Sequence, residues 1–311
     1  MAAVGIHVPV MTREIIAIYG RRADSEAVFI DATLGAGGHA LAVLERFPRA
    51  SLIGFDQDER ARELAAERLS AHSSRVRIVP ENFRGIARLA EDADWRGADG
   101  ILFDLGVSNM QLTAPERGFS FNDDGPLDMR MNQSEGTVTA ETLLATKSVL
   151  ELAGIFRDYG EERHAYRIAK AIVAARDMGD APTTTGGLTA LIRRTLPAPV
   201  QRKMGAHPAR RVFQALRIAV NSELEALDEG LDGALAVTAH MGVIAVISYH
   251  SLEDRIVKRR FLKWSEEGFG RAAAKRPLVP ADEETVCNRS SRSAKLRAFI
   301  KGDTTIRRKK Y

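Results

Sequence analysis

Short apolar runs alternate with amphipathic stretches over the first 105 residues. Apolar runs of the length of buried strands lie at 27–31, 51–55, 75–79 and 100–105. Helical patterns lie between them at 38–47, 59–69 and 84–93. Strands separated by helices of this size predict βαβ units and a parallel sheet covered on both faces. Right-handed crossovers then bring the carboxyl ends of the strands to one edge, where such sheets bind ligands.

The pattern changes near residue 115. Helical segments are expected at 140–144, 149–159, 162–177 and 185–194, with no strand-like run between them. A helical pattern over 210–236 leads to one more buried strand at 242–249, and 268–276 is expected to be a loop. The simplest organisation is an α/β domain formed by 1–114 and 208–311, interrupted by an all-helical domain at 115–207.

Composition narrows the class of protein. Of the 311 residues 45% are hydrophobic and 28% charged, as in ordinary globular proteins. No apolar stretch approaches the ~18 residues that span a bilayer, and the amino terminus lacks the layout of a signal peptide. The single cysteine, Cys287, excludes a disulfide framework and a multi-cysteine metal site. We therefore expect a cytoplasmic protein without a membrane partner; a homodimer stays open.

The net charge of +4 is unevenly distributed. Residues 251–311 hold 17 Lys and Arg against 8 Asp and Glu, and no acid lies between Asp180 and Glu223. Two acid-poor zones indicate a polyanion such as RNA, because cations that neutralise phosphates release counterions. The alternative is that these cations only solvate helix faces and that the basic residues at 307–311 form a solubilising tail.

A glycine-rich segment follows the first strand. In Asp31-Ala-Thr-Leu-Gly35-Ala-Gly37-Gly38-His39-Ala40, glycines permit a tight turn and close approach of a ligand to the backbone. The helix that follows offers unpaired N–H groups, and Asp56 after the second strand could accept both hydroxyls of a ribose. The spacing also satisfies the dinucleotide fingerprint, so NAD is a legitimate alternative, as is a purely structural turn.

Acidic residues near the glycines favour a cationic ligand. Asp31 and Asp104 each end a strand at the expected ligand edge. Carboxylates there suit S-adenosylmethionine, which carries an ammonium and a sulfonium, and would repel a pyrophosphate. Phe83, just after the third strand, is placed either to pack on an adenine or simply to fill the core.

Ordered blocks over nearly the whole chain resemble one family, the RsmH (MraW) ribosomal RNA methyltransferases. The blocks are Gly35-Ala-Gly-Gly-His39, Asp104-Leu-Gly-Val-Ser108, Glu116-Arg-Gly-Phe-Ser-Phe121, Gly125-Pro-Leu-Asp-Met-Arg-Met131, Tyr159-Gly-Glu-Glu-Arg163, His207-Pro-Ala-Arg-Arg211, Phe213-Gln-Ala-Leu-Arg-Ile218, Ile247-Ser-Tyr-His-Ser-Leu-Glu-Asp-Arg-Ile-Val-Lys258 and Ser293-Ala-Lys-Leu-Arg297. The resemblance implies a Rossmann-like class I methyltransferase sheet with an inserted helical substrate-recognition domain. It also implies S-adenosylmethionine-dependent methylation of N4 of a cytidine in the decoding centre (P-site region) of small-subunit (16S) ribosomal RNA.

The same resemblance assigns roles to individual residues. The cofactor site is expected to comprise Gly35, Gly37, Gly38, His39, Asp56, Phe83, Asp104 and Gln111. Where the family has Ser-Ser-Pro-Gln-Leu-Asp, this chain has Ser108-Asn-Met-Gln111-Leu-Thr113, so Gln111 is kept while the proline and the aspartate are missing.

The reaction needs little acid–base chemistry. The exocyclic amine of cytosine is a poor nucleophile, so alignment with the S–CH₃ bond supplies much of the acceleration, and neither a metal nor a strong base is required. Asp104 is the best candidate for a catalytic proton acceptor, although it could instead serve the cofactor. The residues expected to contact substrate are Arg210, Arg211, His250, Arg255 and Lys258. For His250, a structural role is the alternative. For the whole protein, the non-enzymatic alternative is an assembly factor that binds RNA without transferring a methyl group.

Overall fold

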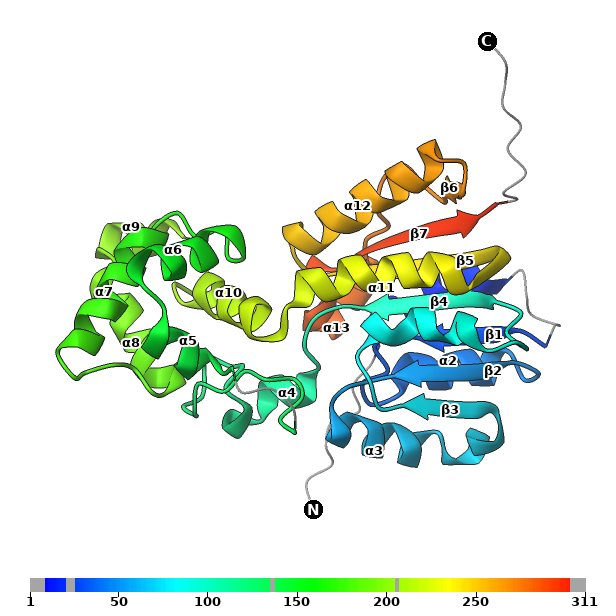
Figure 1. Ribbon diagram of the computed structural model, residues 1–311, viewed down its shortest axis with the longest axis horizontal. Helices are drawn as coiled ribbons and strands as arrows, with labels where there is room; N and C mark the ends of the chain where they lie inside the picture. Colours follow the sequence, from blue (N-terminus) through cyan, green and yellow to red (C-terminus); the bar gives the residue numbers. More distant parts are fainter. Residues whose placement is uncertain (1–8, 21–25, 135–137, 205–206, 303–311) are drawn as a thin grey trace, which may run out of the picture. The chain divides into compact units, whose positions relative to one another are not determined.

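The computed structural model describes residues 9–20, 26–134, 138–204 and 207–302, and the chain forms two compact units (Figure 1). The first unit contains 1–106 and 224–311, and the second contains 107–223. The segments 107–114 and 208–223, which the sequence assigns to the sheet domain, therefore belong to the second unit. The basic tail at 307–311 lies outside the described residues.

A seven-stranded sheet forms the first unit, with the order β3-β2-β1-β4-β5-β7-β6. The strands are β1 (Val28–Asp31), β2 (Ser51–Phe55), β3 (Val76–Val79), β4 (Ala98–Asp104), β5 (Thr238–Ser248), β6 (Gly270–Ala272) and β7 (Lys295–Lys301). The first five are parallel, and β7 is antiparallel to both β5 and β6. The register pairs Asp31 with both Gly54 and Leu102, so the carboxyl ends of β1, β2 and β4 lie side by side. The Rossmann-like fold class predicted from the sequence is confirmed.

Apolar side chains cover both faces of this sheet. Along β4, Leu102 points into one core, while Ile101 and Phe103 point into the other. The first core takes side chains from α1 (Thr12–Tyr19), α2 (Gly38–Arg46) and α3 (Glu59–Arg68). The second core takes them from the 3-10 segment η3 (Phe83–Glu91), α11 (Glu223–Val237) and α12 (Ser251–Glu266). Burial on both faces explains why the strands are nearly continuous apolar runs.

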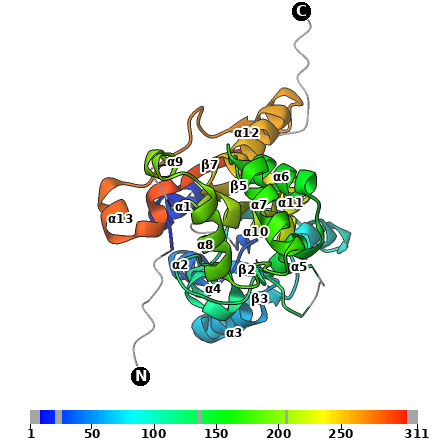
Figure 2. The same cartoon turned by 90° about the vertical axis from the view of Figure 1, so that its left-hand side faces the viewer.

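The second unit is helical, as predicted (Figure 2). Its helices are α4 (Asn109–Thr113), α5 (Ala140–Thr146), α6 (Val149–Asp158), α7 (Ala165–Asp177), α8 (Thr185–Thr195), α9 (Ala198–Lys203) and α10 (Arg210–Asn221), with the 3-10 turn η4 (Pro115–Arg117). One continuous apolar core joins these elements. Between 107 and 134, 138 and 204, and 207 and 223 the structure has no strand, only an isolated bridge between Pro126 and Thr184.

Three expected elements differ from the structure. The helix expected over 210–236 is two helices, because Ser222 adopts a left-handed conformation (φ 47°) that ends α10 before α11 begins. The helix expected at 84–93 is the 3-10 segment η3. Part of the loop expected at 268–276 is strand β6, which pairs with β7, a strand that the sequence did not reveal.

The remaining elements of the first unit lie between the strands and in its last segment. They are the 3-10 turns η2 (Ser70–Arg75) and η5 (Arg289–Ser293) and the helix α13 (Asp282–Cys287). Within the described ranges, no helix has both the length and the apolarity needed to cross a membrane.

Candidate active site

The glycine-rich segment forms a tight turn between β1 and α2. Gly35 (φ 51°) and Gly37 (φ 75°) adopt left-handed conformations that favour glycine, and Gly37 caps α2. Backbone N–H groups of this turn donate to neighbouring strands: Leu34 to the carbonyl of Phe55 at 2.9 Å and Gly35 to Oδ2 of Asp56 at 2.8 Å. The turn is thus fixed against the end of β2, and the first turn of α2 presents N–H groups without partners in the helix.

Asp56 closes the turn from the second strand. One carboxylate oxygen accepts from Gly35 N–H, and the other accepts from Asp58 N–H at 2.8 Å. Burial is the largest influence and raises the pKa of Asp56 to about 6, although both hydrogen bonds oppose the shift. The carboxylate is therefore a structural part of the turn, and its role as an acceptor for a ligand stays a prediction.

Asp31 is buried at the end of β1, with 3% of its surface exposed. Burial raises its pKa to about 6, and the negative charges of Asp104 and Asp56 add to the shift. His39 and a hydrogen bond from Thr33 N–H at 3.2 Å oppose it. The charges of Asp104 and Asp56 therefore act on Asp31, and a group of neighbouring carboxylates of this kind stabilises a cation.

Asp104, at the end of β4, is held by several neighbours. Tyr249 O–H donates to its Oδ1 at 2.7 Å, and its backbone N–H donates to Thr33 Oγ1 at 2.7 Å. His39 Nδ1 lies 3.6 Å from its Oδ2, while His39 Nε2 lies 2.8 Å from the carbonyl of Val10 and donates to it. Burial and the charge of Asp104 raise the pKa of Tyr249 well above its usual value, so the phenol stays protonated and continues to donate.

Phe83 packs in the second core. Its ring meets that of Phe103 edge-on, with centroids 5.4 Å apart, and it lies so close to Gly230 of α11 that a Cβ there would be 2.6 Å from the Phe83 ring. This is the core-filling role that the sequence left open, and contact with adenine stays a prediction. Beside it, Asn82 Nδ2 donates to Gln57 Oε1 at 3.2 Å, which joins the segments after β3 and β2.

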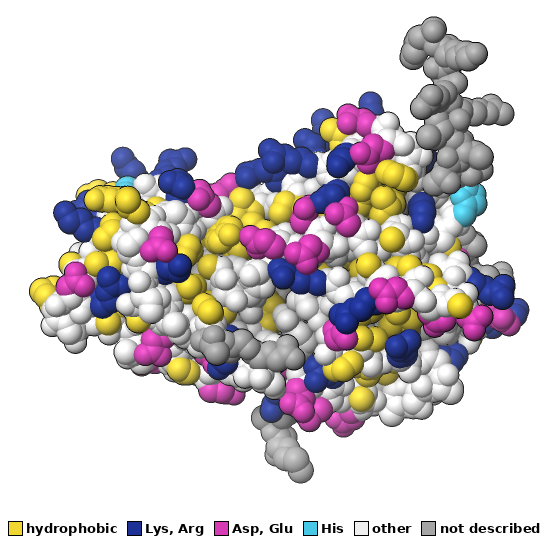
Figure 3. Space-filling model, in the orientation of Figure 1, with side chains coloured by type: hydrophobic (Ala, Val, Ile, Leu, Met, Phe, Trp, Pro, Cys, Tyr) yellow, Lys and Arg dark blue, Asp and Glu magenta, His cyan; other side chains and the backbone are white. Residues whose placement is uncertain are grey.

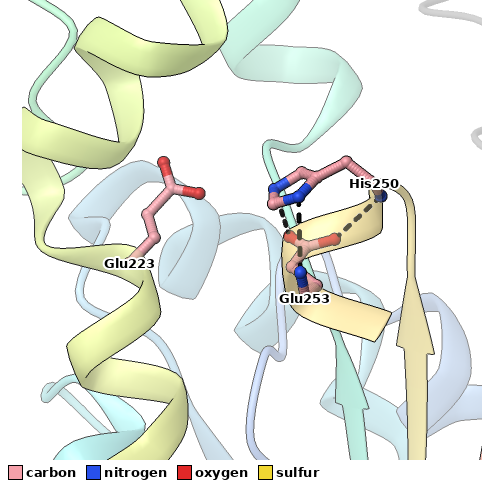
Figure 4. Close-up of side chains that lie close together, drawn as sticks. All are labelled: Glu223, His250 and Glu253. Atoms are coloured by element: carbon pink, nitrogen blue, oxygen red, sulfur yellow. Dashed lines mark hydrogen bonds and ion pairs between the residues drawn. The ribbon is translucent and has the colours of Figure 1, made fainter. Parts of the chain in front are cut away.

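His250 caps α12, as Figure 4 shows. Its Nδ1 accepts from Glu253 N–H at 3.4 Å, and its Nε2 lies 3.1 Å from Glu253 Oε1. The buried Glu253 Oε2 accepts from the backbone N–H groups of Tyr249 and His250, at 2.8 and 3.2 Å. This is the geometry of the structural alternative for His250, and it also fixes the backbone that carries Tyr249.

The predicted RNA-contacting cations differ in their surroundings. Arg255 and Lys258 are exposed on α12, over which Lys and Arg side chains gather along the edge of the molecule in Figure 3. Arg210 is exposed at the first turn of α10. Its neighbour Arg211 instead donates from Nη1 to the carbonyl of Glu161 at 3.0 Å, a contact that supports the fold of the second unit.

Gln111 belongs to the second unit. Its Oε1 accepts from Ser108 N–H at 3.0 Å, and its own N–H donates to Ser108 Oγ at 3.2 Å. The pair forms a capping box that starts α4, so this segment keeps a defined turn without the family's proline.

Comparison with known proteins identifies the family. The MraW methylase family matches residues 5–302. The chain belongs to this family. It is 42% identical over 311 residues to ribosomal RNA small subunit methyltransferase H of Symbiobacterium thermophilum. The aligned region covers 95% of this chain and 96% of the relative. It is 44% identical over 315 residues to the protein of that name from Heliobacterium modesticaldum, with coverages of 95% and 98%.

Solved structures resemble the chain less closely. An rRNA methylase from Streptococcus thermophilus is 10% identical, with a TM-score of 0.43 and coverages of 92% of this chain and 93% of that one. This similarity is too low to add to the assignment. Family membership makes the chain an S-adenosylmethionine-dependent methyltransferase, as the sequence predicted, and excludes the NAD-dependent alternative.

The residues at the sheet edge fit this cofactor. The carboxylates of Asp31 and Asp104 can stabilise positive charge, Asp56 offers carboxylate oxygens, and the first turn of α2 has N–H groups that can bind a carboxylate. Sequence reasoning missed Tyr249 and Thr33, although both stand beside predicted residues. The signal that could have found Tyr249 is its place directly after a strand that ends at the ligand edge.

Proposed function

We propose that this methyltransferase acts in the cytoplasm on small-subunit (16S) ribosomal RNA and methylates N4 of a cytidine in the decoding centre. The relatives named ribosomal RNA small subunit methyltransferase H support the substrate class. The observation that carries the chemistry is the gathering of Asp31, Asp56 and Asp104 around one glycine turn, since neighbouring carboxylates favour a cationic methyl donor.

Each residue around the turn has a distinct part in holding S-adenosylmethionine, which supplies an electrophilic methyl group when bound. Gly35, Gly37 and Gly38 give the ligand access to the backbone N–H groups at the start of α2. Asp56 accepts the ribose hydroxyls, Asp31 stabilises the ammonium, and Phe83 borders the adenine. The role of Gln111 in closing the site remains part of this proposal.

Asp104 is assigned to the amine of the target base. A carboxylate that accepts from the amine hydrogens favours the pyramidal geometry in which the nitrogen lone pair can attack. The proton leaves readily once the nitrogen is alkylated, so Asp104 needs only to be ionised and correctly oriented. Tyr249 acts through Asp104 as a positioning residue, since its 2.7 Å hydrogen bond fixes the carboxylate.

Cations outside the sheet edge are assigned to the RNA backbone. Arg210, Arg255 and Lys258 are exposed and can neutralise phosphates. Arg211 and His250 are assigned mainly to structure, because the first binds a backbone carbonyl and the second caps α12. A base stacked in a helix is inaccessible, so the target cytidine enters unpaired or flipped out.

A single-turnover assay with labelled S-adenosylmethionine tests the proposal. The substrate is small-subunit particles from a strain that lacks this chain. Wild type should transfer label to the RNA, and Asp104→Asn, which keeps the size of the side chain, should transfer it at least about tenfold more slowly. Tight binding of the particles without any transfer of label would support an RNA-binding assembly factor and contradict the proposed reaction.

A further inference from the structure

One face of α7, together with Arg163 just before the helix, combines three cations with an exposed aromatic ring. Arg163, Tyr166, Arg167 and Lys170 follow one another at helical spacing, and all four are exposed; Tyr166 exposes 58% of its surface. The opposite face of α7, which includes Ile168 and Ile172, is buried in the core of the second unit. We name these four residues the α7 stripe. The stripe does not help to hold the unit together, since its members point away from that core.

No interaction within the described residues occupies the α7 stripe. Its three cations have no acidic partner, and the ring of Tyr166 has no aromatic or cationic neighbour among the residues that the structure describes. Two other exposed cations of the same unit are paired: Arg157 with Asp158 at 2.7 Å and Lys147 with Glu151 at 2.9 Å. Residues 163–176 contain no acid, so the positive charge of the stripe is not balanced locally.

The segment that precedes the stripe contacts the first turn of α10, which carries Arg210. Arg211 Nη1 donates to the carbonyl of Glu161, two residues before the stripe begins. Gly160 packs so tightly here that a Cβ would lie 2.5 Å from the carbonyl of Arg211. The first turn of α10 and the segment that leads into α7 are therefore in direct contact, which brings Arg210 and Arg163 to the same region of the second unit.

We propose that the α7 stripe binds a single-stranded segment of the ribosomal RNA substrate. Tyr166 offers a ring on which an unpaired base stacks, and Arg163, Arg167 and Lys170 neutralise the phosphates on either side. Aromatic side chains set among cations are how proteins bind single-stranded nucleic acid without reading its sequence. A folded protein partner fits less well, because charged residues are depleted from the centres of protein interfaces, whereas RNA supplies phosphates along its whole length.

This inference rests on the proposed function for the identity of the RNA, but its test measures binding alone. Affinity for labelled oligo-uridine and for 16S ribosomal RNA is measured by fluorescence anisotropy at several salt concentrations, with the full-length chain. Tyr166→Ala should weaken binding roughly 5- to 100-fold, whereas Tyr166→Phe, which keeps the ring, should bind like wild type. Arg167→Gln with Lys170→Gln should flatten the slope of log affinity against log salt by about 1.4.

Arg157→Gln is the matched control, because it removes an exposed but paired cation from the same unit; it should leave affinity nearly unchanged. Melting temperatures of all variants are compared with that of wild type, since exposed substitutions should not unfold the chain. Wild-type affinity and salt slope in Tyr166→Ala and in the double variant would overturn the inference. So would equal losses in Tyr166→Ala and Tyr166→Phe. If RNA binding depends on Tyr166 but the protein transfers no methyl group, the proposed function is contradicted. The inference that the α7 stripe binds RNA is then still supported.

Discussion

The hydroxyl of Tyr249 donates a 2.7 Å hydrogen bond to Oδ1 of Asp104. Asp104 ends β4 and Tyr249 directly follows the neighbouring parallel strand β5, and the two residues are 145 positions apart in the sequence. The contact ties the strand that resumes the sheet after the helical unit to the strand that precedes it. It also orients the carboxylate that we assign to the target amine.

Tyr249→Phe removes this hydrogen bond and keeps the ring. A hydrogen bond to a charged group contributes about 1.5–3 kcal/mol, so kcat should fall roughly 10- to 100-fold. Affinity for S-adenosylmethionine should change much less, because Asp31 and Asp56 remain. Calorimetric titration with the cofactor and single-turnover rates separate the two effects. An unchanged kcat would show that Asp104 does not need Tyr249.

Cofactor affinity should depend on pH through Asp31 and Asp56. Both have pKa values raised to about 6, so each takes up a proton as the pH falls through this value. A cationic ligand needs the ionised forms, and affinity for S-adenosylmethionine should therefore fall roughly tenfold between about pH 7.5 and 5.5. Asp31→Asn should bind more weakly at neutral pH and show a shallower dependence. An affinity that is constant over this range in wild type would contradict the carboxylate cluster.

The raised pKa of Asp31 affects folding stability in the direction opposite to cofactor affinity: without the cofactor, the protein loses stability as the pH rises. Asp31 has a pKa near 3.8 when unfolded and about 6 when folded, so folding favours its protonated form. The stabilising contribution is complete below the unfolded pKa and is lost as the pH rises through about 6. Asp31→Asn should thus gain stability relative to wild type as the pH is raised from about 4 to 7, by up to about 3 kcal/mol. Urea unfolding at both pH values measures it, and a gain that shrinks with pH would contradict the buried, costly charge.

Local sequence patterns were sufficient to predict the parallel strands and most helices of the second unit. Strands buried on both faces leave continuous apolar runs, and α5 to α8 follow regular helical periodicity. What the sequence did not reveal depends on tertiary contacts. Gly270–Ala272 becomes a strand only because β7 lies beside it, and Ser222 breaks a regular helical pattern by adopting a positive φ. The capping role of His250 depends on its ring nitrogen reaching the backbone N–H of Glu253, a geometry that spacing alone cannot establish.

Two glycines should respond in opposite ways to alanine. Gly37 has φ 75°, and a Cβ there would lie 3.3 Å from Leu69 and 3.4 Å from Ala65, so Gly37→Ala should destabilise the chain by about 1 kcal/mol or more. Gly154 lies within α6 with nothing within 4 Å of its Cβ position. Gly154→Ala should stabilise by up to about 1 kcal/mol and leave cofactor binding unchanged. Thermal unfolding and cofactor titration of both variants check this; equal effects would mean that the turn does not require glycine.

Charge reversal at Arg210 and at Arg211 should have different effects on RNA binding and on stability. Arg210→Glu removes an exposed cation and should weaken RNA binding and flatten its salt dependence without changing the melting temperature. Arg211→Glu also breaks the hydrogen bond to Glu161 and should lower the melting temperature. Anisotropy titrations at several salt concentrations, paired with melting curves, distinguish the two. A wild-type salt slope in Arg210→Glu would remove it from the RNA interface.

Mass spectrometry of 16S ribosomal RNA tests the central claim most directly. RNA is compared from cells that carry the chain, cells that lack it, and deletion cells complemented with Asp104→Asn. The account predicts that one decoding-centre cytidine loses its N4-methyl mark in the deletion strain, regains it with the wild-type chain and stays largely unmodified with the variant. A deletion strain in which every N4-methylcytidine of this RNA is still present would contradict it.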